Sequence, residues 1–313
     1  HNSYMIDKAP YHNAPPYNRQ VIGSLEDLDA ATVPDVQEFF RRWYVPNNVT
    51  LTIAGDFDPA QAKEWVEKYF GEIPTGEEVK NMDVRMGKLS ETIKLYHEDN
   101  FARLPQLTMV WPTVEQYAKD GYALDALTDY LANGKESPFN EVIVDERKLA
   151  PNVYMYNGTS ELAGEAQLIV RAFPETSLDS VMVGVEAAFA RFEADGISET
   201  DLKRIKAGQE TQFYNGLSSV LGKGFQLAQY NMFAGNPGFV EEDIGNILAV
   251  TTADVKRVYE TYLKGKPFVA TSFVPMGEQV LALSGSAKAE VVEEKIKEGA
   301  EDKFDASIAA EYE

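Results

Sequence analysis

A helix followed by a strand occurs twice in this sequence, and the repeat limits the possible folds more than any other feature. In the first copy, Thr32 and Asp35 form a predicted capping box, with Pro34 in the first turn. Apolar side chains then recur at helical spacing, at Val36, Phe39, Phe40, Trp43 and Tyr44. Residues 46–48 interrupt the helix. Residues 49–54 alternate in polarity, which predicts a half-buried strand.

The later copy keeps this order of features. Thr251 and Asp254 again form a predicted capping box. The apolar stripe follows at Val255, Val258, Tyr259, Tyr262 and Leu263. Residues 265–267 contain a glycine and a proline that end the helix, and residues 268–274 read as a strand.

The two copies also share one register, because Phe40 and Tyr259 are 219 positions apart and so are the two caps. Any two amphipathic helices resemble each other to some degree, so chance is the alternative explanation. The shared order of cap, stripe and breaker favours a true repeat. We therefore expect residues 25–55 to superpose on residues 244–274.

The repeat divides the chain into unequal parts. The whole repeating unit that ends with the later copy begins near Glu91. An earlier unit of equal length would therefore begin about 130 residues before His1. The predicted order is the C-terminal part of a first domain (1–78), a linker (79–90), a complete second domain (91–276) and a charged linker or peripheral segment (277–313). Residues 1–75 should then be less well packed than the second domain, because part of their cover is missing.

Helices and strands are mixed in the second domain without strict alternation. Strands are expected at 92–97, 106–111, 153–156 and 165–173, and helices at 117–131, 138–149, 177–192, from 198 onward and at 217–233. The fold class is therefore α+β, with tandem homologous domains, mainly antiparallel sheets covered by helices, and a truncated first domain. Trp43, Trp65 and Trp111 lie on apolar stripes, so we expect them in the core.

The charge balance restricts the partners. Lys and Arg number 29 and Asp and Glu number 50, which gives a formal charge of -21. Such a surface repels nucleic acid and anionic membranes and tolerates basic peptides, although solubility alone also explains it. No apolar run approaches the roughly 18 residues of a transmembrane helix. We therefore expect neither nucleic acid nor a membrane as a partner.

Cysteine is absent from the sequence. Thiol nucleophiles, disulfides and Cys-ligated zinc are thereby excluded. The compartment stays open, with a periplasmic or exported location as the working interpretation. Carboxylates that could form acid–base pairs are Asp125, Asp129, Glu141, Asp145 and Glu146. They lie on predicted helices rich in charge, so we interpret them as solvated faces.

Several segments resemble the pitrilysin/insulinase family of zinc metallopeptidases. They are residues 21–28 (VIGSLEDL), 39–48 (FFRRWYVPNN), 55–58 (GDFD) and 69–71 (YFG). The resemblance covers nearly the whole chain and is sharpest over residues 15–75. It implies that this run closes the first domain of a lobe and that a homologous second domain follows. It also implies a second lobe or partner subunit beyond the tail.

The family holds zinc in an inverted H-x-x-E-H motif with a further Glu downstream, and the motif Glu is the general base. The histidines of this chain are His1, His12 and His97, and none of them begins such a motif. We therefore predict no catalytic and no metal-binding residue here, and Zn²⁺ in the preceding domain of the parent protein. His97 is interpreted as a solvated surface group.

The family also uses an Arg and a Tyr to help hold substrate. The matching stretch, residues 137–151, has Pro151 at the Tyr position and Arg147 out of register, so neither role is carried over. The substrate-binding candidates are Val153, Tyr154, Met155 and Tyr156. They form a short predicted strand, and an extended peptide can add to a sheet edge. An ordinary paired strand is the alternative.

Two functions follow from the resemblance. The chain is either the scaffold and substrate-chamber part of a zinc endopeptidase that acts on peptides or unfolded polypeptides, or a non-catalytic structural or assembly subunit of a heteromeric complex. The sequence preceding His1 separates them, because only the first requires the inverted zinc motif there.

Overall fold

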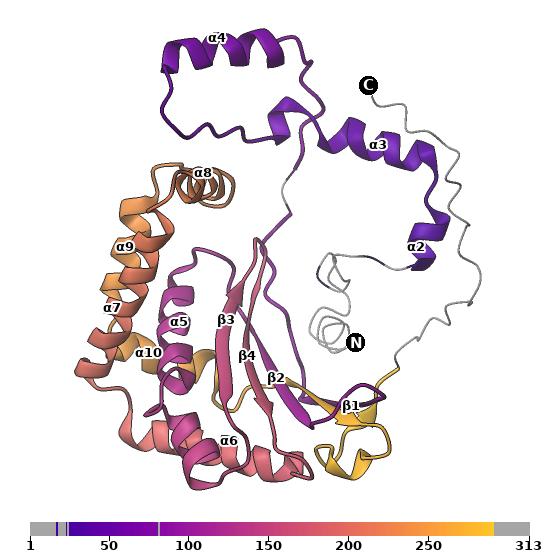
Figure 1. The fold of residues 1–313 in the computed structure, drawn as a ribbon, viewed down its shortest axis with the longest axis vertical. Helices are drawn as coiled ribbons and strands as arrows, with labels where there is room; N and C mark the ends of the chain where they lie inside the picture. Colours follow the sequence, from indigo (N-terminus) through magenta and orange to yellow (C-terminus); the bar gives the residue numbers. More distant parts are fainter. Residues whose placement is uncertain (1–16, 18–22, 24, 81, 291–313) are drawn as a thin grey trace, which may run out of the picture.

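A single six-stranded sheet forms the centre of the computed structural model, which describes residues 17, 23, 25–80 and 82–290 (Figure 1). The strands are β1 (Ile93–Asp99), β2 (Gln106–Thr113), β3 (Val153–Thr159), β4 (Gly164–Arg171), β5 (Val269–Pro275) and β6 (Ala287–Lys288), and they lie side by side in the order β3-β4-β2-β5-β1-β6. The β3–β4, β4–β2 and β2–β5 pairs are antiparallel, and β1 runs parallel to β5 and β6. The predicted α+β class with a mainly antiparallel sheet is confirmed.

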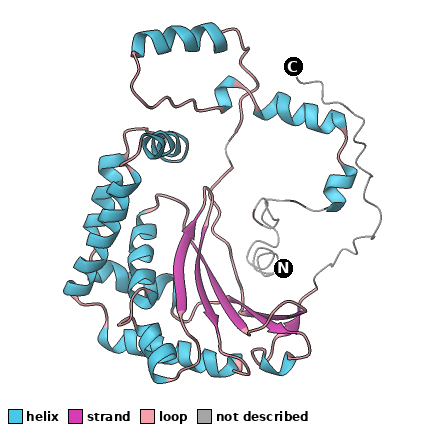
Figure 2. Ribbon diagram, in the orientation of Figure 1, coloured by secondary structure: helices cyan, strands magenta, loops and turns pink. Residues whose placement is uncertain are grey.

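Helices cover one side of this sheet (Figure 2). They are α5 (Lys119–Ala132), η2 (Asn140–Glu146), α6 (Leu178–Asp195), α7 (Glu199–Gly216), α8 (Val220–Gln229), η3 (Tyr230–Ala234), α9 (Val240–Ala249), α10 (Thr252–Val258) and η4 (Tyr259–Leu263). The core forms where the two layers meet. Leu107, Met109 and Trp111 share the predicted face of β2, and each is at most 2% exposed.

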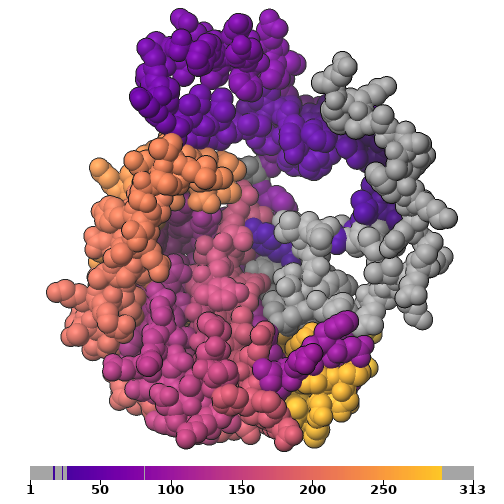
Figure 3. Space-filling model, in the orientation of Figure 1, coloured from indigo at the N-terminus to yellow at the C-terminus, as the bar shows by residue number. Residues whose placement is uncertain are grey.

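Residues 25–80 form a separate, loosely packed segment, drawn in indigo and violet at the top of Figure 3. It contains α2 (Leu25–Ala30), α3 (Val33–Trp43), η1 (Pro46–Asn48) and α4 (Pro59–Phe70). No side chain of residues 27–80 is buried, which confirms the expected difference in packing for this part of the chain. Trp65 is 53% exposed, so its predicted place in the core is wrong.

The predicted strand at residues 49–54 is also wrong, because these residues form no strand in the structure. The backbone at Val49 is extended, with φ of -124° and ψ of 134°. A strand needs a neighbour that accepts and donates its backbone hydrogen bonds. None of the described residues forms a ladder with this segment, which instead lies beside α8 and η3; the side chain of Asn231 on η3 donates to Thr50 Oγ1 at 3.0 Å.

The helical part of the repeat is confirmed. Thr32 caps α3 with φ of -114° and ψ of 162°, and Thr251 caps α10 with φ of -111° and ψ of 163°. In both caps the N3 aspartate accepts from the threonine backbone N–H, at 2.9 Å in the first copy and 3.1 Å in the second. The preceding helices end at Ala30 and Ala249, again 219 positions apart.

The two copies differ in burial. In the first, Val36, Phe39, Phe40 and Tyr44 are 51%, 53%, 51% and 62% exposed. In the second, their counterparts Val255, Val258, Tyr259 and Leu263 are 0%, 0%, 4% and 4% exposed. The same apolar stripe is therefore covered in one copy and uncovered in the other.

The packed unit continues beyond residue 276. Leu281 and Leu283 join the core, and β6 pairs with β1. The segment before β6 contacts the first turn of α6, where Asp179 Oδ1 accepts from the Ser284 backbone N–H at 2.8 Å. Among the helices that the structure describes, none is both long and apolar enough to cross a membrane.

Candidate functional site

The four predicted substrate-binding residues begin β3, which is an edge strand of the sheet. Within the described chain, β3 pairs only with β4. Val153 and Met155 are 3% and 8% exposed and face the helices, whereas Tyr154 and Tyr156 are 58% and 45% exposed on the opposite face. These residues therefore lie on a strand beside which a further strand could pair, and their role in peptide binding stays a prediction.

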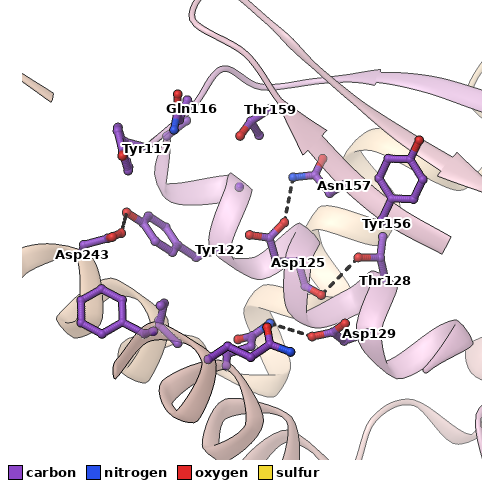
Figure 4. A pocket seen from close by; sticks show the side chains of 16 residues that line it. Gln116, Tyr117, Tyr122, Asp125, Thr128, Asp129, Tyr156, Asn157, Thr159 and Asp243 are labelled. Atoms are coloured by element: carbon purple, nitrogen blue, oxygen red, sulfur yellow. Dashed lines mark hydrogen bonds between the residues drawn. The ribbon is translucent and has the colours of Figure 1, made fainter. Parts of the chain in front are cut away.

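A cavity of about 460 Å³ lies beside the other end of β3, between that strand, α5, α7 and α9 (Figure 4). We call it the β3 cavity. The residues that define it are Tyr117, Tyr122, Asp125, Asp129, Tyr156, Asn157, Phe213 and Asp243. Tyr117 adopts a left-handed φ of 63°, which is uncommon for an aromatic residue, and its ring contacts those of Tyr230 and Phe239.

Asp125 and Asp129 are four residues apart on α5, so their carboxylates share one face of the helix. The Asn157 side chain donates to Asp125 Oδ1 at 3.0 Å, and the Gln209 side chain donates to Asp129 Oδ2 at 3.0 Å. The Asp125 side chain is exposed, but the protein around its carboxyl group removes part of its hydration, and this desolvation, with a smaller contribution from neighbouring carboxylates, raises its pKa to about 6. Burial also raises the pKa of Asp129.

Asp243 on α9 is the third carboxylate of the cavity, and its hydrogen bonds connect α9 with α5 and η3. Its side chain is 8% exposed. The Tyr122 hydroxyl donates to Oδ1 and the Tyr230 hydroxyl donates to Oδ2, each at 2.6 Å. Burial, followed by the adjacent carboxylate, raises the pKa of both tyrosines, so both stay protonated donors at neutral pH.

The interpretation of the helical carboxylates as solvated faces holds for Asp125, which is exposed, and is wrong for Asp129, which is partly buried; both line the cavity. Two others follow it more closely: Glu141 and Glu146 accept from Arg191 at 3.0 and 2.8 Å in a partly exposed ion-pair group. The signal available in the sequence was the i, i+4 spacing of Asp125 and Asp129. It did not show that this face of the helix meets β3.

The residues that the structure describes do not fit a zinc site, since no three His, Cys, Asp or Glu side chains among them are grouped to hold a metal. His97 is 6% exposed and its ring stacks on Phe273 at 5.4 Å, so its interpretation as a solvated group is wrong. The reason is that β1 is an inner strand of the sheet, between β5 and β6. His1 and His12 lie outside the described residues.

Comparisons with known proteins agree with this architecture. The family model of the peptidase M16 inactive domain matches residues 30–209. Zinc protease PqqE from Helicobacter pylori is 23% identical over 270 residues, which are 81% of this chain and 57% of the relative. The chain thus spans little more than half the length of that protein.

Two solved structures show the same fold. A protease from Helicobacter pylori has a TM-score of 0.71 and 21% identity, over 83% of this chain and 63% of that one. A chain of Complex III2 from Candida albicans, solved with Inz-5 bound, has a TM-score of 0.72 and 14% identity, over 87% of this chain and 66% of that one. The family match, together with the repeat and the α+β fold, establishes that this chain belongs to the pitrilysin-type peptidase M16 family and carries its inactive domain.

Proposed function

We propose that this chain is the non-catalytic scaffold and substrate-chamber part of a zinc-dependent endopeptidase that acts on peptides or unfolded polypeptides. The zinc site would lie in a preceding domain, and residues 1–78 would be the C-terminal part of that domain. The observation that carries the proposal is the difference in cover between the two copies of the repeat. Val36 and Phe40 are exposed where Val255 and Tyr259 are buried.

The covered copy indicates what kind of partner the uncovered one requires. Tyr259 packs against Phe189 and Phe192 of α6, with ring centroids 5.6 and 4.9 Å apart. A preceding domain homologous to residues 91–250 would offer α3 the same layer of helix and sheet. Exposed apolar area of this extent favours association, because each buried Å² contributes about 25 cal/mol.

We expect the polypeptide that includes the preceding domain to bind one zinc ion and to hydrolyse unfolded polypeptides. A chelator should abolish hydrolysis, and so should replacing the general-base Glu of an H-x-x-E-H motif by Gln. The measurements are metal content and cleavage of a quenched fluorescent peptide. A preceding domain without the motif, which covers α3 but supports no hydrolysis, would instead favour the structural-subunit alternative.

Peptide binding at the edge of β3 gives a second test. Tyr154→Ser should weaken peptide binding by the full-length protein up to about fivefold, because a cross-strand contact contributes about 0.2–1 kcal/mol. Tyr154 is 58% exposed, so the fold should be unaffected. Met155 is a poorer choice, because it is 8% exposed and belongs to the core.

Phe101→Ser is the matched control. Phe101 is 91% exposed in the turn after β1, and β1 lies toward the other edge of the sheet from β3. Binding measured by fluorescence anisotropy should be unchanged in this variant. Equal affinities for Tyr154→Ser and the unaltered protein would contradict a peptide on this edge.

A further inference from the structure

We propose that the β3 cavity holds the side chain of a lysine or arginine from an extended peptide paired with β3. The inference rests on the proposed function, because it names the kind of peptide that the edge strand accepts. It depends on two independent observations: the cavity opens at the free edge of β3, and its walls carry negative charge with no basic side chain among the described residues that line it.

The position of the cavity follows from the alternation of β3. Tyr156 points to the open face of the sheet, whereas Asn157 and Thr159 point to the helix face. All three line the cavity, so it wraps around the edge of the strand. A peptide added at this edge would extend every second side chain toward the helices, and one of them would enter the cavity.

The charge of the walls selects the side chain. Carboxylates come from three positions, Asp125, Asp129 and Asp243, and the lining contains no Lys, Arg or His from the part of the chain that the structure describes. Asn157 donates to Asp125 Oδ1, but no described residue donates to Oδ2, which points into the cavity (Figure 4). A carboxylate oxygen at the cavity surface without a protein donor is an acceptor for an ammonium or guanidinium group.

Size and lining fit a long basic side chain better than a metal ion. The volume of about 460 Å³ is within the usual range of ligand pockets. Tyr122 and Phe213 offer apolar surface to the aliphatic stem, while the charged end reaches the carboxylates. The same carboxylates are not grouped to hold a metal in the part of the chain that the structure describes.

Matched peptides test the proposal in the full-length protein after zinc is removed with a chelator, so that binding is measured without cleavage. An extended peptide with one central Lys is compared with the same peptide carrying norleucine, both with acetylated N-termini. The Lys peptide should bind about tenfold more tightly, as expected for one charge-assisted hydrogen bond. A free N-terminus on the norleucine peptide shows whether a main-chain amine can take the same place.

Asp125→Asn identifies the carboxylate. It should remove most of the tenfold preference for Lys while leaving the affinity for the norleucine peptide unchanged. The control is Glu136→Gln, which removes one charge from an exposed side chain in the loop after α5 and should change neither quantity.

The preference should also depend on pH. The groups that face Asp125 are Asp129 on the same helix, Asn157 on β3, Gln209 on α7 and Asp243 on α9. Since Asp125 takes up a proton as the pH falls through about 6, the preference for Lys should decline between pH 7 and 5. The norleucine peptide should show no such change.

The outcomes separate the proposal from the function on which it rests. Equal binding of the Lys and norleucine peptides would overturn the basic pocket and leave peptide binding at β3 intact. A preference for Lys that survives Asp125→Asn would also overturn it. If neither peptide binds, both this proposal and peptide binding by this chain are wrong.

Discussion

Tyr259→Ala is expected to destabilise the chain by about 3–5 kcal/mol, whereas Phe40→Ala should change its stability by less than about 0.5 kcal/mol. The two residues occupy the same position of the repeated helix, eight residues after Thr251 and Thr32 respectively. Tyr259 is 4% exposed and packs on two phenylalanine rings, so its removal leaves a cavity in the core. Phe40 is 51% exposed and has little packing to lose.

Urea unfolding of the two variants measures this difference, with the slope against urea concentration as a check that each still unfolds in the same way. In the polypeptide that includes the preceding domain, Phe40→Ala should become costly and approach the value for Tyr259→Ala. A large cost for Phe40→Ala in the chain alone would contradict an uncovered stripe. A cost that stays near zero in the longer polypeptide would contradict a homologous cover.

Local signals in the sequence predicted the helices of the second domain well. Ser177 and Ser198 cap α6 and α7, where their hydroxyl oxygens accept from Asp179 and Asp201 backbone N–H groups at 3.2 and 3.1 Å. Such caps are set by residues within one turn, so a single sequence contains them. The register of the repeat also came from local features and places α3 on α10 and η4.

Features that depend on a neighbour were not predictable. Residues 49–54 have the alternation of a strand, but strand formation requires a second strand, which the described chain does not provide. Trp65 and Tyr259 both lie on the apolar stripe of a helix, yet only Tyr259 is covered by other parts of the described chain. The spacing of apolar residues shows which face of a helix is suited to burial, but it does not show what buries that face.

The candidate site could not be predicted from the sequence for a related reason. Asp125 and Asp129 lie on a polar face of α5, and such faces usually meet solvent. Here that face turns toward β3, whose residues come about thirty positions later in the sequence, and the carboxylates become the walls of a cavity. His97 is a further case, because its acidic neighbours suggested a surface position, whereas its strand is an inner strand of the sheet.

Asp243→Ala is expected to destabilise the chain by about 2–5 kcal/mol. It removes the acceptor of two hydroxyl groups, those of Tyr122 and Tyr230, and Tyr230 is only 1% exposed. A buried donor left without an acceptor costs about 1–3 kcal/mol. Asp243→Asn keeps one oxygen acceptor and should cost less. Unfolding by urea gives both values.

Removing the donors first isolates the network from other effects of the substitution. With Tyr122→Phe and Tyr230→Phe already present, Asp243→Ala should cost at least 1 kcal/mol less than it does alone, because no hydroxyl is then left without a partner. Equal costs in the two backgrounds would show that the tyrosines do not depend on Asp243. The size of the effect on stability also separates Asp243 from Asp125. Loss of Asp243 should weaken the fold because it satisfies two donors. Loss of charge at Asp125 should change stability little, because that side chain is exposed and only the Asn157 side chain donates to it.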